Sequence, residues 1–277
     1  MKKCRSKGFL IIGIIFMAAS IFFVLYPTVS SVVNNLFAVN TINNYTASLD
    51  SISAADKSDR LSAAVDYNNN LSHLINGFTY DTDSVIDGYD DILNFGDGLI
   101  GYIDIPKINV KLPIFHGDTD KVLEKGVAHI PNTAFPIGGI GTHSVLSAHT
   151  GYPTQVFFDN LNELEIGDEI KVSVLDETLT YAVTAKNIVK PDNISLLSVD
   201  EEKDLLSLIT CYPYGVNSHR LIVTAERVKD TAASDTATKT ENNNNGSFDF
   251  IIAVIVITAI LAILVIAVSI KNKRRRK

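Results

Sequence analysis

Two long uncharged segments near the two ends of the chain constrain its fold more than any other feature. Gly8 to Tyr26 is 19 residues without a charge, and Pro27 follows, where we expect the apolar segment to end. Phe250 to Ile270 is 21 uncharged residues rich in Ile, Val, Ala and Leu. A helix of about 20 apolar residues crosses the hydrocarbon core of a bilayer. Each segment is therefore predicted to be a transmembrane helix.

Each uncharged segment is flanked by basic residues on the side nearer the end of the chain. Residues 1–7 carry four Lys or Arg, residues 271–277 carry six, and neither tail holds an acidic residue. Because cytoplasmic flanks are enriched in Lys and Arg, both tails are expected in the cytoplasm. A cleaved signal peptide is the alternative for the first segment, but no convincing small-residue cleavage site follows it. The predicted localisation is the cell membrane, crossed twice, with the intervening chain extracytoplasmic.

The chain between the two spans is strongly acidic. The tails hold ten of the 24 Lys and Arg, so the remainder carries 14 basic against 31 acidic residues, a formal net charge of −17. Such a surface repels polyanions, which excludes nucleic-acid binding. The two cysteines, Cys4 and Cys211, are expected on opposite sides of the membrane, so no disulfide joins them. No metal-site motif and no phosphate-binding glycine loop occurs, and neither a metal nor a cofactor is predicted.

Short apolar runs broken by turn residues begin at Leu99 and predict a β domain. Seven runs in about 130 residues are typical of a closed barrel or a sandwich. They are residues 99–105, 109–114, 143–148, 169–175, 179–188, 205–210 and 220–228. A turn of helix is expected at Glu201 to Asp204.

The chain before the β domain is predicted to be helical and then irregular. Between Ser30 and Gly77, apolar residues at helical spacing predict one or two amphipathic helices, and Asp56-Lys57 is expected to open one of them. Phe78 to Asp97 is rich in Asp and is expected to form an irregular acidic loop. The predicted organisation is a basic tail (1–7), a transmembrane anchor (8–26), a helical region (27–98), a β domain (99–229), a flexible linker (230–249), a transmembrane helix (250–270) and a basic tail (271–277).

The chemistry of the chain is predicted to centre on the sequence Leu-Ile-Thr-Cys-Tyr-Pro-Tyr-Gly, residues 208–215. An apolar strand ends at Cys211, Pro213 and Gly215 turn the chain, and Arg220 begins a returning strand. That hairpin brings the Arg220 guanidinium toward the sulfur, and a cation beside a thiol stabilises a thiolate or a developing oxyanion. The alternative is that Cys211 is a small buried hydrophobic residue.

A nucleophilic cysteine needs a proton-transfer partner, and the six histidines differ in their placement. His149 lies at the end of a predicted strand and before a turn, which mirrors the placement of Cys211. If the two strands are neighbours, both side chains emerge at one rim of the barrel. His129 and His143 are interpreted as structural hydrogen-bonding residues, and His219 either orients the site or caps the turn. From the residues alone, the choice between His149 and the other histidines stays open.

These motifs, taken together, resemble the signatures of sortases. Ala148-His149-Thr150-Gly151, Leu208-Ile209-Thr210-Cys211 and His219-Arg220 are similar to the His, Leu-X-Thr-Cys and Arg motifs of that family, in the same order and spacing. The stretch from Gly101 to Ile114 also resembles the family's opening strands. The likeness covers about residues 99–228. The N-terminal extension and the second apolar segment are similar to class C, the pilin-polymerising sortases of Gram-positive bacteria.

The resemblance implies a mainly β fold: a closed eight-stranded sortase-type barrel at residues 99–229, with N-terminal helices and two transmembrane helices. It implies a cysteine transpeptidase that cleaves an LPXTG-like sorting signal between Thr and Gly through a thioester. In the family's mechanism Cys211 would be the nucleophile, His149 the proton donor and acceptor, and Arg220 the oxyanion and substrate contact. Thr210 and His219 would support the substrate or the oxyanion. The implied partners are the bilayer and LPXTG-type pilin or surface-protein substrates, with a pilin lysine as acceptor.

One departure from class C concerns the lid that covers the site in many of its members. No proline occurs between Pro27 and Pro106, so the Asp-Pro-aromatic lid motif is absent in its standard form. Phe78, Tyr80 and Asp81 lie in the corresponding region and are the candidate lid residues, and a mobile acidic linker is the alternative. A class B-like or cell-wall-anchoring sortase, a membrane-tethered cysteine protease and a non-catalytic adhesion module also stay open.

Overall fold

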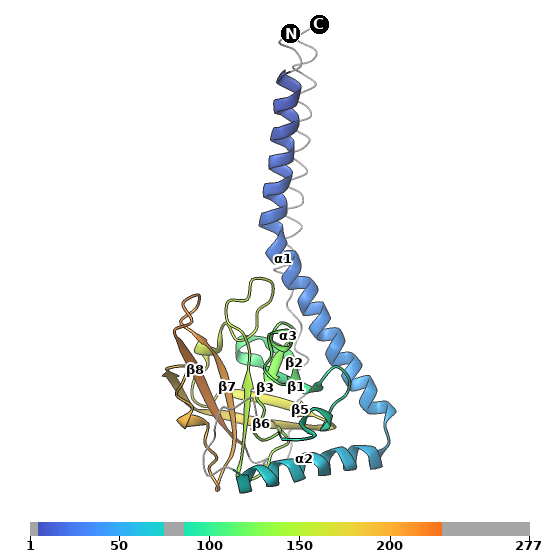
Figure 1. Ribbon diagram of the computed structural model, residues 1–277, viewed down its shortest axis with the longest axis vertical. Helices are drawn as coiled ribbons and strands as arrows, with labels where there is room; N and C mark the ends of the chain where they lie inside the picture. The colour runs from blue at the N-terminus through green and yellow to red at the C-terminus, as the bar shows by residue number, and fades with distance from the viewer. Residues whose placement is uncertain (1–4, 75–85, 229–277) are drawn as a thin grey trace. The chain divides into compact units, whose positions relative to one another are not determined.

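The computed structural model describes residues 5–74 and 86–228. The chain divides between Val32 and Val33 into two compact units, so the long helix α1 (Arg5–Ser51) contributes to both. The unit that begins at Val33 holds the end of α1, helix α2 (Ala54–Leu74) and all the described strands (Figure 1). The predicted transmembrane segment Phe250 to Ile270 and the candidate lid residues Phe78, Tyr80 and Asp81 lie outside the described residues.

Eight strands close into a barrel in the order β1-β2-β3-β4-β7-β8-β6-β5. The pairs β2–β3 and β4–β7 are parallel and the other neighbours are antiparallel. The predicted closed barrel is therefore confirmed, and the sandwich is excluded. The strands are β1 (Leu99–Ile105), β2 (Val110–His116), β3 (Val127–His129), β4 (Thr142–Ser147), β5 (Glu169–Val174), β6 (Glu177–Val189), β7 (Asp204–Tyr212) and β8 (His219–Arg227).

Seven strands coincide with the runs predicted from sequence, and β3 was not predicted. A strand of three residues is too short to show an alternating pattern, yet β3 pairs with β2 on one side and β4 on the other. The helical turn expected at Glu201 to Asp204 is wrong, because Asp204 already begins β7. The remaining short helices are α3 (Asp120–Leu123) and four 3₁₀ turns, η1 (Tyr89–Asp91), η2 (Pro106–Ile108), η3 (Leu161–Glu163) and η4 (Ser195–Leu197).

Alternation along the strands sorts their apolar side chains into two clusters. Leu146, Leu208 and Val223 belong to the main core inside the barrel. Their chain neighbours Val145, Ile209 and Ile222 point to the opposite side of the sheet, because successive residues of a strand face opposite ways. There they form a second group, the outer-face cluster, with Ile130, Leu197, Val189 and Ile194.

Helix α1 continues through Pro27. The expectation that the apolar helix ends at this residue is therefore wrong. Proline lacks an amide hydrogen and costs a helix interior about 3 kcal/mol. Beyond it, burial of one helix face stabilises the continuation to Ser51. That face consists of residues spaced three or four apart: Ala38, Ile42, Tyr45 and Leu49. Among the described residues, α1 is the one helix long and apolar enough to cross a membrane.

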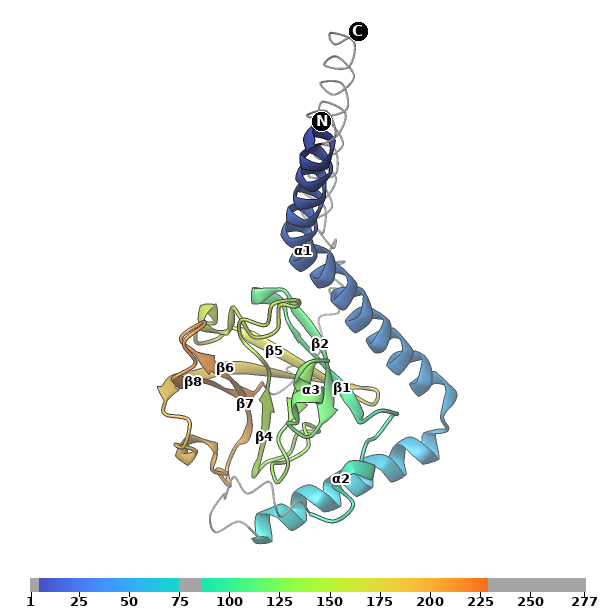
Figure 2. The same ribbon diagram turned by 45° about the horizontal axis from the view of Figure 1, so that its top comes forward.

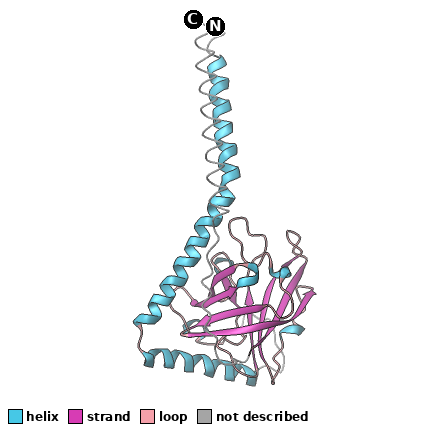
Figure 3. Cartoon of the chain, turned by 180° about the vertical axis from the view of Figure 1, so that it is seen from behind, coloured by secondary structure: helices cyan, strands magenta, loops and turns pink. Residues whose placement is uncertain are grey.

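Helix α2 lies outside the barrel, and Figure 2 shows it running alongside the strands. Figure 3 shows α2 beside the magenta strands from the other side, with the short helices among those strands. Ala64, Tyr67 and Leu71 form its buried face. Asn68 fixes the contact, because its side-chain amide donates to the Phe135 carbonyl at 3.1 Å and its oxygen accepts from the Phe135 amide at 2.7 Å.

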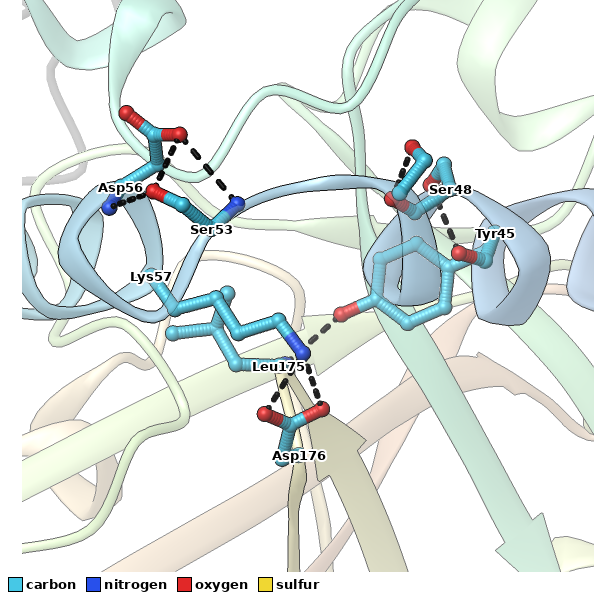
Figure 4. A network of polar contacts seen from close by, with 8 residues as sticks. Tyr45, Ser48, Ser53, Asp56, Lys57, Leu175 and Asp176 are labelled. Atoms are coloured by element: carbon cyan, nitrogen blue, oxygen red, sulfur yellow. Dashed lines mark hydrogen bonds and ion pairs between the residues drawn. The ribbon is translucent and has the colours of Figure 1, made fainter.

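The corner between α1 and α2 is attached to the turn that joins β5 and β6 (Figure 4). The Leu175 amide donates to the Tyr45 hydroxyl oxygen at 2.7 Å, and Lys57 Nζ lies 2.8 Å from an Asp176 carboxylate oxygen. Ser53 and Asp56 cap the start of α2: the Asp56 amide donates to the Ser53 hydroxyl, which in turn donates to the Asp56 carboxylate. The helix predicted near Asp56 is confirmed and begins two residues earlier, at Ala54.

Candidate active site

Cys211 and Arg220 face each other across the β7–β8 hairpin that the sequence predicts. They are paired residues in the antiparallel register, so their side chains project from the same face of the sheet. Cys211 is a free, half-buried thiol, and Arg220 is half-buried as well. The Pro213 carbonyl accepts hydrogen bonds from the amides of Val216 and Asn217, which closes the intervening turn.

His149 reaches the same place from a different strand. Strands β4 and β7 are parallel with Ser147 opposite Ile209, and the Ala148 amide donates to the Ile209 carbonyl at 3.2 Å. Continuing this register by two residues places His149 beside Cys211. The condition set by the sequence analysis, that the two strands be neighbours, is met.

Cys211 and Arg220 share the outer face of the sheet, and His149 lies just beyond the end of the neighbouring strand β4. His149 is half-buried, and its ring contacts Tyr152 and Phe157. Cys211 lies two residues beyond Ile209, and Arg220 lies two residues before Ile222, both members of the outer-face cluster. The thiol and the guanidinium therefore lie at one end of the outer-face cluster, beside the segment that carries the imidazole.

Thr210 joins the cysteine strand to the histidine segment. Its side chain is 3 % exposed, and its hydroxyl donates to the Ala148 carbonyl at 2.8 Å. The hydroxyl is thus engaged with the backbone next to His149. Thr210 also lines a cavity of about 60 Å³ beside Cys211, together with Thr150, Phe158, Asp159, Asn162, Tyr212, Tyr214 and Leu221.

His219 occupies the alternate position of the hairpin. It pairs with Tyr212, so it faces the side of the sheet opposite to Cys211 and Arg220. Ser218 Oγ lies 2.9 Å from His219 Nδ1, and the His219 carbonyl accepts from Arg220 Nη1 at 3.1 Å. The register therefore brings Cys211, His149 and Arg220 together and places the His219 ring away from them.

The other described histidines of the barrel make structural hydrogen bonds, as predicted for His129 and His143. His129 Nδ1 lies 2.8 Å from the Tyr89 hydroxyl, and its Nε2 lies 2.9 Å from the Ala134 carbonyl. Complete burial lowers the pKa of His129 to about 3, so the ring is neutral at physiological pH. His143 contacts the Ser198 carbonyl and the Ser207 hydroxyl, and burial lowers its pKa too. Among the described residues, no group of three or more His, Cys, Asp or Glu could hold a metal ion.

The aromatic residues that contact His149 were not predicted from the sequence. The imidazole stacks on the Tyr152 ring, with centroids 5.3 Å apart and planes 5° apart, and meets the edge of Phe157 at 6.2 Å. Both residues follow the strand end in a loop without periodicity, so only their nearness in sequence could have suggested them.

A profile of the sortase domain matches residues 103–228, which contain all three converging side chains. The crystal structure of Streptococcus agalactiae sortase C1 is 36% identical, with a TM-score of 0.62, and the match covers 69% of this chain and 99% of that one. The chain belongs to the sortase family. Sortases are cysteine transpeptidases, and the predicted membership of that family is confirmed.

Two further sortases extend the comparison. Clostridium perfringens sortase C, solved with a C-terminal cell wall sorting motif, is 38% identical with a TM-score of 0.62, and the match covers 69% of this chain and all of that one. Sortase D of Bacillus subtilis is 35% identical over 131 residues, which are 46% of this chain and 63% of the relative. The match to this curated sortase thus spans less than two thirds of its length.

Proposed function

We propose that this sortase is a membrane-anchored cysteine transpeptidase that cleaves an LPXTG-like sorting signal between Thr and Gly and joins it to an amine. The observation that carries the proposal is the meeting of Cys211, His149 and Arg220 at the ends of three neighbouring chain segments. A nucleophile, a proton-transfer group and a fixed cation on neighbouring segments of a rigid barrel are the parts that acyl transfer through a thioester needs.

In the proposed first half-reaction, the Cys211 thiolate attacks the carbonyl carbon of the signal's Thr. The bond from that carbon to the Gly nitrogen breaks, and the His149 imidazolium gives its proton to the departing amine. The acyl group stays on the enzyme as a thioester. In the second half-reaction an amine attacks the thioester carbonyl, His149 takes the amine's proton, an amide bond forms and the thiolate leaves.

Arg220 stabilises the oxyanion of each tetrahedral intermediate in this scheme. A guanidinium carries five N–H donors in a planar fork, and backbone carbonyls of His219 and Asn217 engage those on Nη1. These contacts hold the group in place on the cysteine's side of the hairpin. A donor fixed before the reaction stabilises developing charge without reorganisation.

The substrate class follows from the outer-face cluster and from the relatives. The half-buried members of the outer-face cluster, Val189, Ile194 and Ile209, offer apolar side chains that suit the Leu and Pro of a sorting signal. The Clostridium perfringens relative, solved with a sorting motif, supports the same substrate class. The relatives titled sortase C include a pilus-related enzyme of Group B Streptococcus, 36% identical, which supports a pilin lysine as the acceptor and pilus polymerisation as the role.

The proposed topology places this chemistry outside the cytoplasm. Helix α1 supplies one span, and the apolar segment Phe250 to Ile270 supplies the second. Both basic tails then lie in the cytoplasm, and the barrel between the spans faces secreted substrates.

The test is a ligation assay with the full chain in detergent. An LPXTG peptide is offered with and without a lysine-containing acceptor peptide, and the products are identified by mass. The proposal expects an amide between the Thr carboxyl and the lysine amine, lost in Cys211→Ala. Hydrolysis of the peptide without ligation would instead identify a membrane-tethered protease. A preference for a peptidoglycan cross-bridge amine over a protein lysine would identify a cell-wall-anchoring sortase.

A further inference from the structure

The ring plane of His149 is set by packing. Among the described residues, no hydrogen-bonding partner is placed on either imidazole nitrogen of His149. The ring instead lies parallel to Tyr152, and the edge of Phe157, which is fully buried, meets both rings. A group that transfers protons must hold its orientation, because small displacements of a catalytic group cost large factors in rate. Whatever fixes Tyr152 and Phe157 therefore fixes His149.

The loop that carries both aromatic residues is closed by one carboxylate. Asp159 Oδ1 accepts a hydrogen bond from the Gly151 amide at 2.8 Å, and Oδ2 accepts from the Phe157 amide at 2.9 Å. The Gly151 amide lies next to Tyr152, and the other amide belongs to Phe157 itself. The Phe158 amide also donates to the His149 carbonyl at 3.0 Å, so the end of the loop returns to its beginning.

We propose that Asp159 is a positioning residue: its carboxylate closes the loop of residues 150–158 and thereby fixes the ring plane of His149 through Tyr152 and Phe157. The inference deepens the proposed function and rests on it only where it assigns proton transfer to His149. Asp159 acts through other residues and is not assigned a contact with the reacting atoms.

The chemistry of the two acceptor positions explains why this residue is an acid. Both carboxylate oxygens face backbone N–H donors, so both positions must be acceptors. An Asn side chain has one oxygen and one NH₂ group, and either amide orientation sets an N–H donor against another. Asp159→Asn therefore keeps the shape of the side chain and breaks at least one of the two bonds.

The experiment compares Asp159→Asn with a matched control in the next loop, Asp168→Asn. Asp168 Oδ2 likewise accepts from a backbone amide three residues earlier, that of Glu165, at 2.8 Å. The side-chain oxygen of an Asn at this position can still accept from the Glu165 amide, so the control loses one carboxylate charge and keeps its backbone bond, without touching the aromatic loop. Tyr152→Phe preserves the stacking ring and Tyr152→Leu removes it.

Two measurements are made on the full chain in detergent. The first is the NMR shift of the His149 Hε1 proton in ¹³C-histidine-labelled protein without substrate, assigned with His149→Gln. Stacking on Tyr152 imposes a ring-current shift that Asp159→Asn and Tyr152→Leu should reduce, whereas Tyr152→Phe and Asp168→Asn should preserve it. The second is the ligation rate: kcat should fall about tenfold or more in Asp159→Asn, the loss expected from one charge-assisted hydrogen bond, while KM for the sorting peptide stays unchanged.

The outcomes separate the inference from the function on which it rests. An unchanged His149 resonance in Asp159→Asn overturns the positioning role, whatever the rate does. A changed resonance with an unchanged kcat upholds the contact between the loop and the ring and overturns the role of His149 in the transfer. A fall in kcat of equal size in Asp168→Asn would reduce the effect to the loss of one negative charge and would also overturn the inference.

Discussion

Replacing Thr210 by Val tests how the cysteine strand holds the histidine segment. The substitution preserves the side chain's shape and exchanges the hydroxyl for a methyl group. Two hydrogen bonds join the backbone before His149 to β7: the Ala148 amide to the Ile209 carbonyl, and the Thr210 hydroxyl to the Ala148 carbonyl. Thr210→Val removes the second bond and leaves a buried carbonyl oxygen without that donor.

The size of the effect follows from the burial of the bond. Thr210 and Ala148 are each 3 % exposed, so water does not readily replace the lost donor. Leaving one buried acceptor unsatisfied costs about 1 to 3 kcal/mol. If the bond holds His149 in place during the reaction, this energy appears in the transition state and kcat falls about 5- to 150-fold. If the bond only stabilises the fold, the melting temperature falls about 2 to 4 °C per kcal/mol and kcat stays the same.

The assay measures both quantities in Thr210→Val, Thr210→Ser and Ser173→Ala. Thr210→Ser keeps the hydroxyl and should behave as the parent. Ser173 lies on β5, away from Cys211, and its buried hydroxyl contacts Thr178, so Ser173→Ala should lower the melting temperature alone. We expect kcat to fall in Thr210→Val beyond anything seen in Ser173→Ala. An unchanged kcat in Thr210→Val, with a lowered melting temperature, would refute the reasoning.

Three other substitutions test the account at separate points. Tyr45→Phe removes the acceptor of the buried Leu175 amide and should lower the free energy of unfolding by about 1 to 3 kcal/mol, with the ligation rate unchanged. Urea titration measures this loss, and an unaltered urea midpoint would contradict the contribution of this hydrogen bond. His129 is buried in its neutral form with a pKa of about 3, so below pH 6.5 the unfolded state binds more protons than the folded state and stability is lost as the pH falls. Between pH 6.5 and 4 the free energy of unfolding should fall by about 3 kcal/mol. The fall should be smaller in His129→Asn. Equal acid sensitivity in that variant would contradict the shift. Arg220→Lys keeps the charge but not the planar fork, so kcat should fall by about 10²-fold or more, as for loss of an oxyanion donor; parental kcat would contradict that role.

Most strands of the barrel could be predicted from sequence because apolar alternation is a local signal. The β7–β8 hairpin was the most predictable part of the site, since Pro213 and Gly215 mark the turn and the returning strand follows directly. Its antiparallel register alone places Arg220 opposite Cys211. No long-range information was needed for that pair.

The position of His149 depended on information that the chain's local pattern does not carry. Strands β4 and β7 are parallel neighbours although about 60 residues separate them, and pairing between distant strands leaves no mark in either strand alone. The loop closure by Asp159 was missed for a related reason. Its carboxylate bonds to amides two and eight residues earlier, and the sequence of an irregular loop does not reveal such contacts.

Tertiary packing also overrode a local signal in the helical region. A proline usually marks the end of a helix, but α1 passes through Pro27 and continues to Ser51. The helical spacing of Ala38, Ile42, Tyr45 and Leu49 is the signal in the sequence that indicates a buried helix face beyond the proline.

Intact-mass spectrometry of the full chain incubated with an LPXTG peptide, without an amine acceptor, tests the central claim most directly. The account predicts an adduct with the mass of the peptide up to and including its Thr, bound to Cys211 as a hydroxylamine-sensitive thioester. The adduct should be absent in Cys211→Ala and should form more slowly in His149→Gln. Peptide cleavage that persists in Cys211→Ala would contradict the account, as would cleavage at another bond.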